Sequence, residues 1–390
     1  MRPAGSSPSR SLAPDRRAAL IAAPVTVERS PALGRGFRLS SSRLYLKPTA
    51  IRRAAANGRP LAGGPFTFGA VTVMTRDATG VRTAEATLAQ VRAWAAAEGL
   101  DTAREVDVWL ARLSAPRPPF AGLASGRPYL MGIVNATPDS FLDRGAHAAP
   151  ESAVAHGRAL IAEGASLIDI GGESTRPGAD PVATDEELRR VLPVVRGLAG
   201  AGVPLSIDSR KAAVMAAALD AGAAVINDVS ALSHDPASLP LVAARGAPAI
   251  LMHMAGEPKT MNVAPAYDHV TLDVYDWLEK RVEACVGAGI PRDRLAVDPG
   301  FGFGKGPEHN ATLLADIALF HGLGCWLIVG PSGKRFADRP KQVRTAADRL
   351  AETLAATRTA AAHGAQMVRV HDVAAAAAAL DGPGAMIGNP

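Results

Sequence analysis

The chain has 390 residues, of which 48% are hydrophobic and 20% charged, so it can bury a large core and is neither disordered as a whole nor a small disulfide-stapled scaffold. Its two cysteines, Cys285 and Cys325, exclude a disulfide framework or a cysteine-type zinc site and indicate a reducing compartment. No apolar run reaches the roughly 18 residues that a membrane span needs, so we expect no membrane partner.

Residues 1–59 are predicted to be a disordered or weakly ordered basic tail. Residues 1–60 contain twelve Lys or Arg against two Asp or Glu, which leaves thirty basic against thirty-five acidic residues in the rest of the chain. Because the positive charge is confined to this tail and only 4% of residues are aromatic, we expect no nucleic-acid partner. An Arg- and Ser-rich start that is poor in acids also fits a transit peptide. The expected location is cytoplasmic, with an organelle as the alternative.

Residues 60–113 are predicted to form a small α/β module. Alternating apolar residues over 66–74 indicate one strand, and residues 84–97 and 102–113 have the composition of two helices separated by Gly99. Residues 114–120 contain three prolines, which cannot continue a helix and stiffen the chain. We expect this segment to be a linker that ends the module.

Residues 121–390 are predicted to fold as a (β/α)8 TIM barrel. Eight short apolar runs alternate with segments of helical composition, among them 151–163, 185–198, 270–288 and 342–362. The expected strands centre on Ile133, Ile168, Ser206, Val225, Leu251, Val297, Ile328 and Val368. An open doubly wound sheet is the alternative, and it is disfavoured because no G-x-G-x-x-G turn follows the first strand.

Polar residues follow every expected strand of this barrel, at the end where such barrels carry their active sites. The segments are 135–141 (NATPDSF), 169–177 (DIGGESTRP), 208–211 (DSRK), 227–228 (ND), 252–254 (MHM), 298–305 (DPGFGFGK), 330–335 (GPSGKR) and 369–372 (RVHD). Taken singly, Asp169, Asp228 and Asp372 are better explained as helix caps or supporting residues, and His253 equally well as a core histidine. Their convergence on one rim nevertheless predicts a binding site.

The residue types on this rim indicate the ligand. Asp208, Asn227 and Asp298, on separate strands, can accept and donate hydrogen bonds in one plane, as a flat heterocycle with an amino-pyrimidinone edge requires. Such a ligand fits the rim better than a zinc ion or a hydrolase substrate. The sequence has no Cys/His cluster for zinc and no ordered Ser-His-Asp set.

A second group of rim residues is suited to an anion. Arg369, His371 and Arg176 supply hydrogen-bond donors, and the guanidinium fork of arginine matches phosphate. Asn135 offers a neutral carbonyl oxygen to Mg²⁺ that is bound mainly by phosphate and water. A phosphate-bearing heterocycle with Mg²⁺ therefore fits the whole rim.

The runs MGIVNATPDSF, DIGGESTRPG, INDVSA, DPGFGFGK and RVHDV, in this order and spacing, closely resemble dihydropteroate synthase, an enzyme family of folate biosynthesis. The resemblance spans residues 129–390, and residues 60–113, with YLKPTAI before them, resemble N-terminal extensions of some bacterial members. The family joins p-aminobenzoate to 7,8-dihydropterin-6-ylmethyl pyrophosphate and releases pyrophosphate. The resemblance implies a TIM-barrel transferase that uses Mg²⁺, takes these small-molecule substrates and forms a homodimer.

The resemblance also assigns roles to individual residues. The residues implied to hold the pterin are Asp208, Asn227, Met252, Asp298 and Lys334. Pyrophosphate is implied to contact Asn135, Arg369 and His371, with Asn135 as the protein ligand of Mg²⁺. The p-aminobenzoate site is implied to consist of Phe141, Thr175, Arg176, Pro177 and Ser332. The expected catalytic residues are Asp208, Asp298, Lys334 and Arg369, because a carboxylate stabilises the pterin methylene cation and an arginine stabilises the departing pyrophosphate.

Two departures from the family pattern concern the p-aminobenzoate side. The motif after the seventh strand is usually S-R-K, whereas Gly333 makes it S-G-K here, and Arg335 is the candidate substitute for the missing guanidinium. Residues 142–147 also lack the usual pair of glycines. These departures leave a catalytically weak paralogue that binds pterin as the alternative to an active synthase. A pterin-dependent methyltransferase is disfavoured, because it has no need of the NATPDSF and RVH segments.

Overall fold

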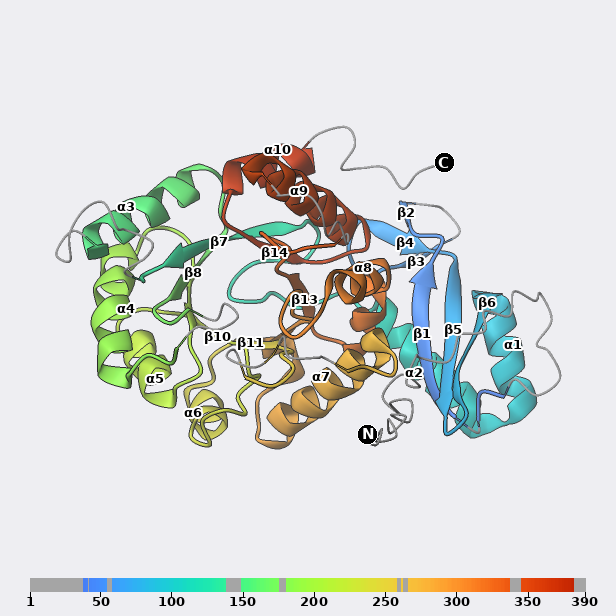
Figure 1. Cartoon of the computed structure of the whole chain (residues 1–390). Helices are drawn as coiled ribbons and strands as arrows, with labels where there is room; N and C mark the ends of the chain where they lie inside the picture. Colours follow the sequence, from blue (N-terminus) through green and yellow to red (C-terminus); the bar gives the residue numbers. More distant parts are fainter. Residues whose placement is uncertain are drawn as a thin grey trace, which may run out of the picture.

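The computed structural model describes residues 38–40, 42–54, 58–137, 149–174, 180–257, 261, 266–336 and 345–381, which form a closed barrel and a smaller module beside it (Figure 1). The parallel barrel strands are β7 (Tyr129–Asn135), β8 (Leu167–Gly171), β9 (Leu205–Asp208), β10 (Val225–Asp228), β11 (Ala249–Met252), β12 (Leu295–Asp298), β13 (Trp326–Val329) and β14 (Met367–Val370). Strand β14 pairs with β7, which closes the sheet. The predicted TIM barrel is confirmed, and the open sheet is excluded.

Helices cover the outside of this barrel because its strands are apolar on both faces. They are α3 (Ala149–Ala162), α4 (Thr184–Leu198), α5 (Ala212–Asp220), α6 (Ser238–Arg245), α7 (Val270–Gly287), α8 (Pro307–Ala315), α9 (Ala346–Ala362) and α10 (Val373–Asp381). Helix α4 shows the principle: it buries Val191, Val194, Val195 and Leu198, the stripe that a 3.6-residue period places on one side. No helix of the described residues is both long and apolar enough to cross a membrane.

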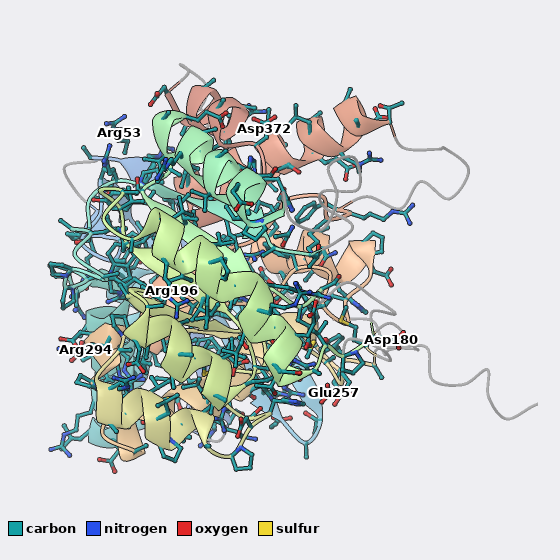
Figure 2. The ribbon with its side chains drawn as sticks, turned by 90° about the vertical axis from the view of Figure 1, so that its left-hand side faces the viewer. Arg53, Asp180, Arg196, Glu257, Arg294 and Asp372 are labelled. Carbon is teal, nitrogen blue, oxygen red and sulfur yellow. The ribbon has the colours of Figure 1, made fainter. Side chains whose placement is uncertain are left out.

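The two ends of the barrel differ in character. Asp180 and Glu257, which follow strands β8 and β11, lie at one end, and Arg294, which precedes β12, lies at the other (Figure 2). At the end where the strands begin, the rings of Phe120, Tyr129 and Trp326 close the interior. The Trp326 ring contacts the other two, with ring centroids 5.5 Å from Phe120 and 6.1 Å from Tyr129. The end where the strands finish therefore remains as the place for a pocket.

Residues 114–120 pack against the closed end of the barrel instead of forming a free linker. The buried guanidinium of Arg117 donates to the carbonyl oxygens of Cys325 (3.0 Å) and His321 (2.8 Å). Trp326 Nε1 donates to the Pro118 carbonyl oxygen at 2.8 Å. The prolines do end the preceding helix, α2 (Leu100–Ser114), as expected. The segment does run from the module to the barrel, but it is held in place by long-range hydrogen bonds, which leave no local pattern in the sequence.

The N-terminal module begins earlier than predicted. Its main sheet has the antiparallel order β1 (Arg43–Thr49), β5 (Ala70–Asp77) and β6 (Gly80–Thr87), and a second small sheet joins β2 (Arg52–Arg53), β4 (Phe66–Phe68) and β3 (Arg59–Pro60). Strand β1 lies within the stretch predicted to be a weakly ordered tail, yet Leu44, Tyr45 and Leu46 are fully buried. That prediction is therefore wrong for residues 43–49. This segment contains few apolar residues, and it forms a strand only because it pairs with β5.

Helix α1 (Leu88–Glu98) also begins later than the expected residue 84. Residues 80–87 pair with β5 along their whole length, and the buried Ala84 and Ala86 lie two positions apart, as on one face of a strand. Thr87 then caps the helix by accepting a hydrogen bond from the backbone N–H of Gln90. An alanine-rich composition concealed this change of period.

Aromatic packing fixes the module to the barrel wall. Tyr45 of β1, Trp109 of α2 and Tyr275 of α7 contact one another, with Trp109 and Tyr275 stacked at 5.4 Å between ring centroids. Lys47 pairs with Asp316 at 2.8 Å across the same interface. The module is thus part of one packed structure with the barrel, on the side of α7 and the 3₁₀ helix η4 (Ile317–Leu323) (Figure 1).

Candidate active site

A pocket of about 970 Å³ opens at the end of the barrel where the strands finish. It collects side chains from strand ends or following loops all around the barrel, as the closed parallel sheet requires. Of the thirteen residues predicted to form the site, nine line the pocket: Asn135, Asp208, Asn227, Met252, Asp298, Ser332, Lys334, Arg369 and His371. The other four, Phe141, Thr175, Arg176 and Pro177, lie outside the described residues.

A buried carboxylate that was not among the predicted site residues connects three of the lining side chains. Asp169 of β8 is fully buried and accepts a hydrogen bond from Asn227 Nδ2 at 3.0 Å. Arg369 donates to Asp169 at 2.6 Å and to Asp208 at 2.8 Å, so one guanidinium bridges two carboxylates. Asp169 thus has the supporting role that was one of its two expected roles. An acid inside an apolar strand was the signal for it, because such a residue needs a partner.

The other aspartates expected to be structural do close local turns. Asp228 accepts from the backbone N–H groups of Ser230 at 2.7 Å and Leu232 at 3.0 Å. Asp372 accepts from the backbone N–H of Ala375 at 2.9 Å, at the start of α10. These contacts are those of a turn and a helix cap, as predicted from the sequence.

The pKa values of two pocket carboxyl groups, Asp208 and Asp298, are raised above those of ordinary aspartates. Burial, and after it the charge of Asp169, raises the pKa of Asp208 to about 7, although Arg369 opposes the rise. Burial raises the pKa of Asp298 to about 6 against the opposing effects of the Gly300 N–H and of Arg369. A carboxylate that is costly to ionise inside the protein gains most from a ligand that donates hydrogen bonds to it.

The loops after β12 and β13 meet on one wall of the pocket. Lys334 Nζ lies 4.2 Å from the centroid of the Phe303 ring, a cation–π contact. Ser332 Oγ is 2.8 Å from His371 Nδ1 and accepts from the His371 backbone N–H at 3.3 Å, which joins the predicted p-aminobenzoate side to the predicted pyrophosphate side. Gly333 has φ +70°, in the left-handed region that favours glycine.

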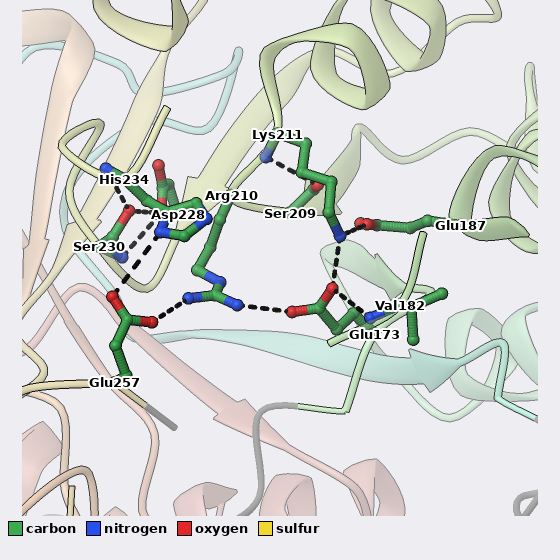
Figure 3. Close-up of polar contacts among 10 residues, drawn as sticks. All are labelled: Glu173, Val182, Glu187, Ser209, Arg210, Lys211, Asp228, Ser230, His234 and Glu257. Carbon is green, nitrogen blue, oxygen red and sulfur yellow. Dashed lines mark hydrogen bonds and ion pairs between the residues drawn. The ribbon is translucent and has the colours of Figure 1, made fainter. Parts of the chain in front are cut away.

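A network of ion pairs holds the loops after β8, β9 and β11 together (Figure 3). Arg210 donates to Glu173 and to Glu257, each at 2.7 Å. Lys211 pairs with Glu173 and with Glu187 of α4. Glu173 also accepts from the backbone N–H of Val182 at 3.2 Å, so it joins the two ends of the loop after β8. Sequence reasoning missed this network, since its members are far apart in the chain.

Whether the pocket can bind Mg²⁺ depends on which side chains could serve as its ligands. The described residues hold no group of three or more His, Cys, Asp or Glu side chains that is arranged for a metal ion. Asn135 lines the pocket together with Arg369 and His371, a neutral oxygen beside two donors for an anion. This set fits a Mg²⁺ ion that arrives with a phosphate ligand and keeps its waters.

Comparisons with known proteins agree with this geometry. The family described as "pterin binding enzyme" matches residues 131–371. Dihydropteroate synthase of Escherichia coli (strain K12) is 45% identical over 247 residues, which are 63% of this chain and 87% of that protein. The same enzyme of Neisseria meningitidis serogroup B (strain ATCC BAA-335 / MC58) is 45% identical over 260 residues, 65% of this chain and 91% of that protein.

Solved structures give the same result for the fold. The Xanthomonas albilineans dihydropteroate synthase with 4-aminobenzoic acid has a TM-score of 0.63 at 48% identity, over 68% of this chain and 96% of that one. The same enzyme in complex with 7,8-dihydropteroate has a TM-score of 0.58 at 45% identity, over 65% of this chain and 91% of that one. The chain belongs to the dihydropteroate synthase family of pterin-binding enzymes.

Proposed function

We propose that this chain condenses 7,8-dihydropterin-6-ylmethyl pyrophosphate with p-aminobenzoate, forming 7,8-dihydropteroate and pyrophosphate in folate biosynthesis. The observation that carries the proposal is the placement of Asp208, Asn227 and Asp298 around one pocket, with Arg369 hydrogen-bonded to Asp208. The carboxylates and the amide match the amino-pyrimidinone edge of a pterin, and the arginine matches its pyrophosphate. Related structures hold 4-aminobenzoic acid and 7,8-dihydropteroate, the second substrate and the product of the proposed reaction, which supports the reaction.

The chain's own residues account for the chemical step. The C–O bond of the pterin methylene breaks and its electron pair leaves with pyrophosphate. Asp208 and Asp298 stabilise the positive charge on the pterin, and Arg369 stabilises the negative charge on the leaving group. The arylamine nitrogen of p-aminobenzoate then forms the new C–N bond and gives one proton to water. No protein nucleophile is needed, since the incoming amine is the nucleophile.

We place Mg²⁺ at Asn135, beside Arg369 and His371. When bound, Mg²⁺ supplies Lewis-acid stabilisation of the pyrophosphate oxygens. Calorimetric titration tests this placement. Mg²⁺ alone is expected to bind weakly, and pyrophosphate is expected to tighten its binding, because one neutral protein ligand cannot form a metal cage. Tight stoichiometric binding of Mg²⁺ without any phosphate ligand would contradict the placement.

The decisive experiment measures dihydropteroate and pyrophosphate formation by purified protein, with either substrate omitted as the control. Equal amounts of both products that require both substrates are expected. A catalytically weak paralogue would bind the pterin but release no pyrophosphate.

Two further expectations are a homodimer, which the family resemblance implies and sedimentation measures, and a cytoplasmic location, which cell fractionation measures. The free and buried thiols of Cys285 and Cys325 support a reducing compartment.

A further inference from the structure

A buried lysine lies behind the pterin side of the pocket. Lys305 ends the segment that follows strand β12 and is 5% exposed. Lysine is among the residues least often buried, and a buried ammonium group needs several hydrogen-bond partners to offset its lost hydration. The roles assigned above to the pocket residues make no use of this group.

Four acceptors surround its ammonium nitrogen. Lys305 Nζ lies 2.8 Å from His253 Nδ1 and donates to the carbonyl oxygens of His253 (3.2 Å), Gly300 (3.0 Å) and Phe303 (3.0 Å). Burial and the charge of Lys305 lower the pKa of His253 well below its usual value, so this imidazole is neutral and its Nδ1 accepts. The three N–H donors of Lys305 are thus fully used within the protein.

The glycines of residues 298–305 bring those carbonyls together. Gly300, Gly302 and Gly304 all have φ near +70°, which L side chains rarely adopt. A Cβ atom on Gly300 would lie 2.1 Å from the His253 carbonyl oxygen, so the loop packs closely against the end of β11. Carbonyl groups turned inward in this way require a donor, and Lys305 provides it.

The same loop carries the contacts of the predicted pterin site. The backbone N–H of Gly300 donates to Asp298 Oδ1 at 2.8 Å. The Phe303 ring lies under Lys334 Nζ, and a Cβ on Gly302 would lie 2.8 Å from Lys334 Cδ. Both side chains expected to hold the pterin on this wall are therefore positioned by backbone that Lys305 holds.

We propose that Lys305 is a positioning residue for pterin binding: its ammonium group gathers three backbone carbonyls and His253 and so fixes the loop that places Asp298 and Lys334. This inference rests on the proposed pterin site. It predicts that loss of the ammonium group weakens pterin capture selectively, since the p-aminobenzoate side is assigned to other loops.

The first experiment compares Lys305→Met with Lys280→Met, a matched change at an exposed position on α7. Thermal unfolding checks that both variants fold. Lys305→Met is expected to raise the KM for the pterin pyrophosphate about tenfold or more, with the KM for p-aminobenzoate changed by less than about twofold. Lys280→Met is expected to change neither. Equal KM values for wild type, Lys305→Met and Lys280→Met in folded protein would overturn the proposal.

A pH profile separates positioning from a general loss of structure. The charged or titratable groups around Lys305 and Asp298 are Lys334, Arg369 and His253. Burial lowers the pKa of Lys305 to about 7, and below that pH its positive charge lowers the pKa of Asp298. Removing that charge is expected to move the acid limb of kcat/KM for the pterin substrate to higher pH. A limb at the wild-type position, together with a reduced kcat, would indicate a structural role only and contradict the proposal.

A second pair of variants keeps the test valid if Lys305→Met does not fold. His253→Asn retains an acceptor near the position of Nδ1, and His253→Leu removes it. We expect His253→Leu to raise the KM for the pterin substrate about threefold or more and His253→Asn to leave it near wild type. Equal effects of the two variants would contradict the proposal. If the wild-type protein forms no dihydropteroate, the proposed function fails. Calorimetry of the same variants with 6-hydroxymethyl-7,8-dihydropterin then still tests whether Lys305 positions the pterin site.

Discussion

The pKa of Asp208 in the pocket depends on its burial and on two neighbouring charged groups. Asp208 faces Arg369 but also has the carboxylate of Asp169 nearby, and burial outweighs the ion pair in setting its acidity. Under the proposed function, the N–H edge of the pterin adds two donors to the one that Arg369 directs at this carboxylate. These donors would offset a further part of the cost of keeping the acid buried.

Asp208→Asn is expected to cripple pterin binding while leaving the fold intact. The amide would present an N–H group to N–H donors of the ligand, and an unsatisfied buried group costs about 1–3 kcal/mol, more where charge is involved. Calorimetric titration with a pterin ligand measures the loss, and thermal unfolding is the control for the fold. Unchanged affinity would remove Asp208 from the site.

Pterin affinity is expected to rise with pH between about 5 and 8. The raised pKa values of Asp208, about 7, and Asp298, about 6, mean that both carboxylates are increasingly protonated as the pH falls through these values. A protonated carboxyl group loses one acceptor position, so binding weakens on the acid side. Titrations across this range test the sign. An affinity independent of pH would show that neither carboxylate binds in its ionised form.

A substitution at Gly333 tests the predicted p-aminobenzoate side of the pocket. A Cβ at this position meets nothing within 4 Å, so space is available, but φ is +70° and any other residue is strained by about 1–2 kcal/mol. We expect Gly333→Arg to lower the KM for p-aminobenzoate about tenfold relative to Gly333→Ala, which carries the strain without the guanidinium. Equal KM values would assign the charge to Arg335, which also lines the pocket, and Arg335→Ala would then raise KM.

At the scale of elements, the rim depends on ion pairs that connect neighbouring loops. Glu173, at the end of β8, is held by Arg210 and Lys211 from the loop after β9 (Figure 3). Lys211 also pairs with Glu187, which is fully buried in the first turn of α4. One lysine thus joins the loop after β9 to the helix that follows β8.

Lys211→Met is expected to destabilise the fold by about 3–5 kcal/mol, because it leaves the Glu187 carboxylate buried without its cation. The double variant Lys211→Met/Glu187→Leu is expected to regain most of that stability, since no buried charge remains there. Urea unfolding of wild type and both variants measures the difference. A double variant no more stable than Lys211→Met would show that the loss comes from Glu173 or from packing.

The barrel elements were predictable, whereas most strands of the module were not: the one strand expected over 66–74 is β4 and β5, and four further strands lie beside them. The eight parallel strands carry mainly apolar residues on both faces, so each appears in the sequence as a short, largely apolar run. Strand β1 contains Arg43, Lys47 and Pro48 and follows a polar segment, so its run is hard to distinguish from a tail. Strand β6 contains Ala84, Glu85 and Ala86, residues more typical of helices, and only pairing with β5 makes it a strand.

At the scale of the whole molecule, the module and the barrel share one apolar interface. Trp109 packs between Tyr45 and Tyr275, and a Cβ on Gly322 of η4 would lie 2.0 Å from the Trp109 ring. Ion pairs from Arg76 to Asp273 (2.6 Å) and from Lys47 to Asp316 surround this aromatic contact. The module therefore covers a side of the barrel away from the pocket and contributes to stability.

Gly322→Ala is expected to destabilise the protein by about 1–3 kcal/mol, because the added methyl group overlaps the Trp109 ring. In a Trp109→Ala background the same change is expected to have little further effect, which a double-mutant cycle measures by chemical unfolding. The KM values of the folded variants should stay at wild type, since the interface is remote from the pocket. Additive losses in the double variant would contradict this packing.

The sequence by itself determined the barrel, the family and the set of strand-end residues, because parallel strands and their loops leave local patterns of apolar runs followed by polar motifs. Only the tertiary structure decided which residues support them. Asp169 beneath Arg369, Lys305 beneath the glycine loop and Arg117 beneath the barrel each act through partners distant in the chain. Asp169 was recognisable as an acid within an apolar strand, but the partners of all three residues are fixed only when distant segments meet, and no local period or spacing encodes those partners.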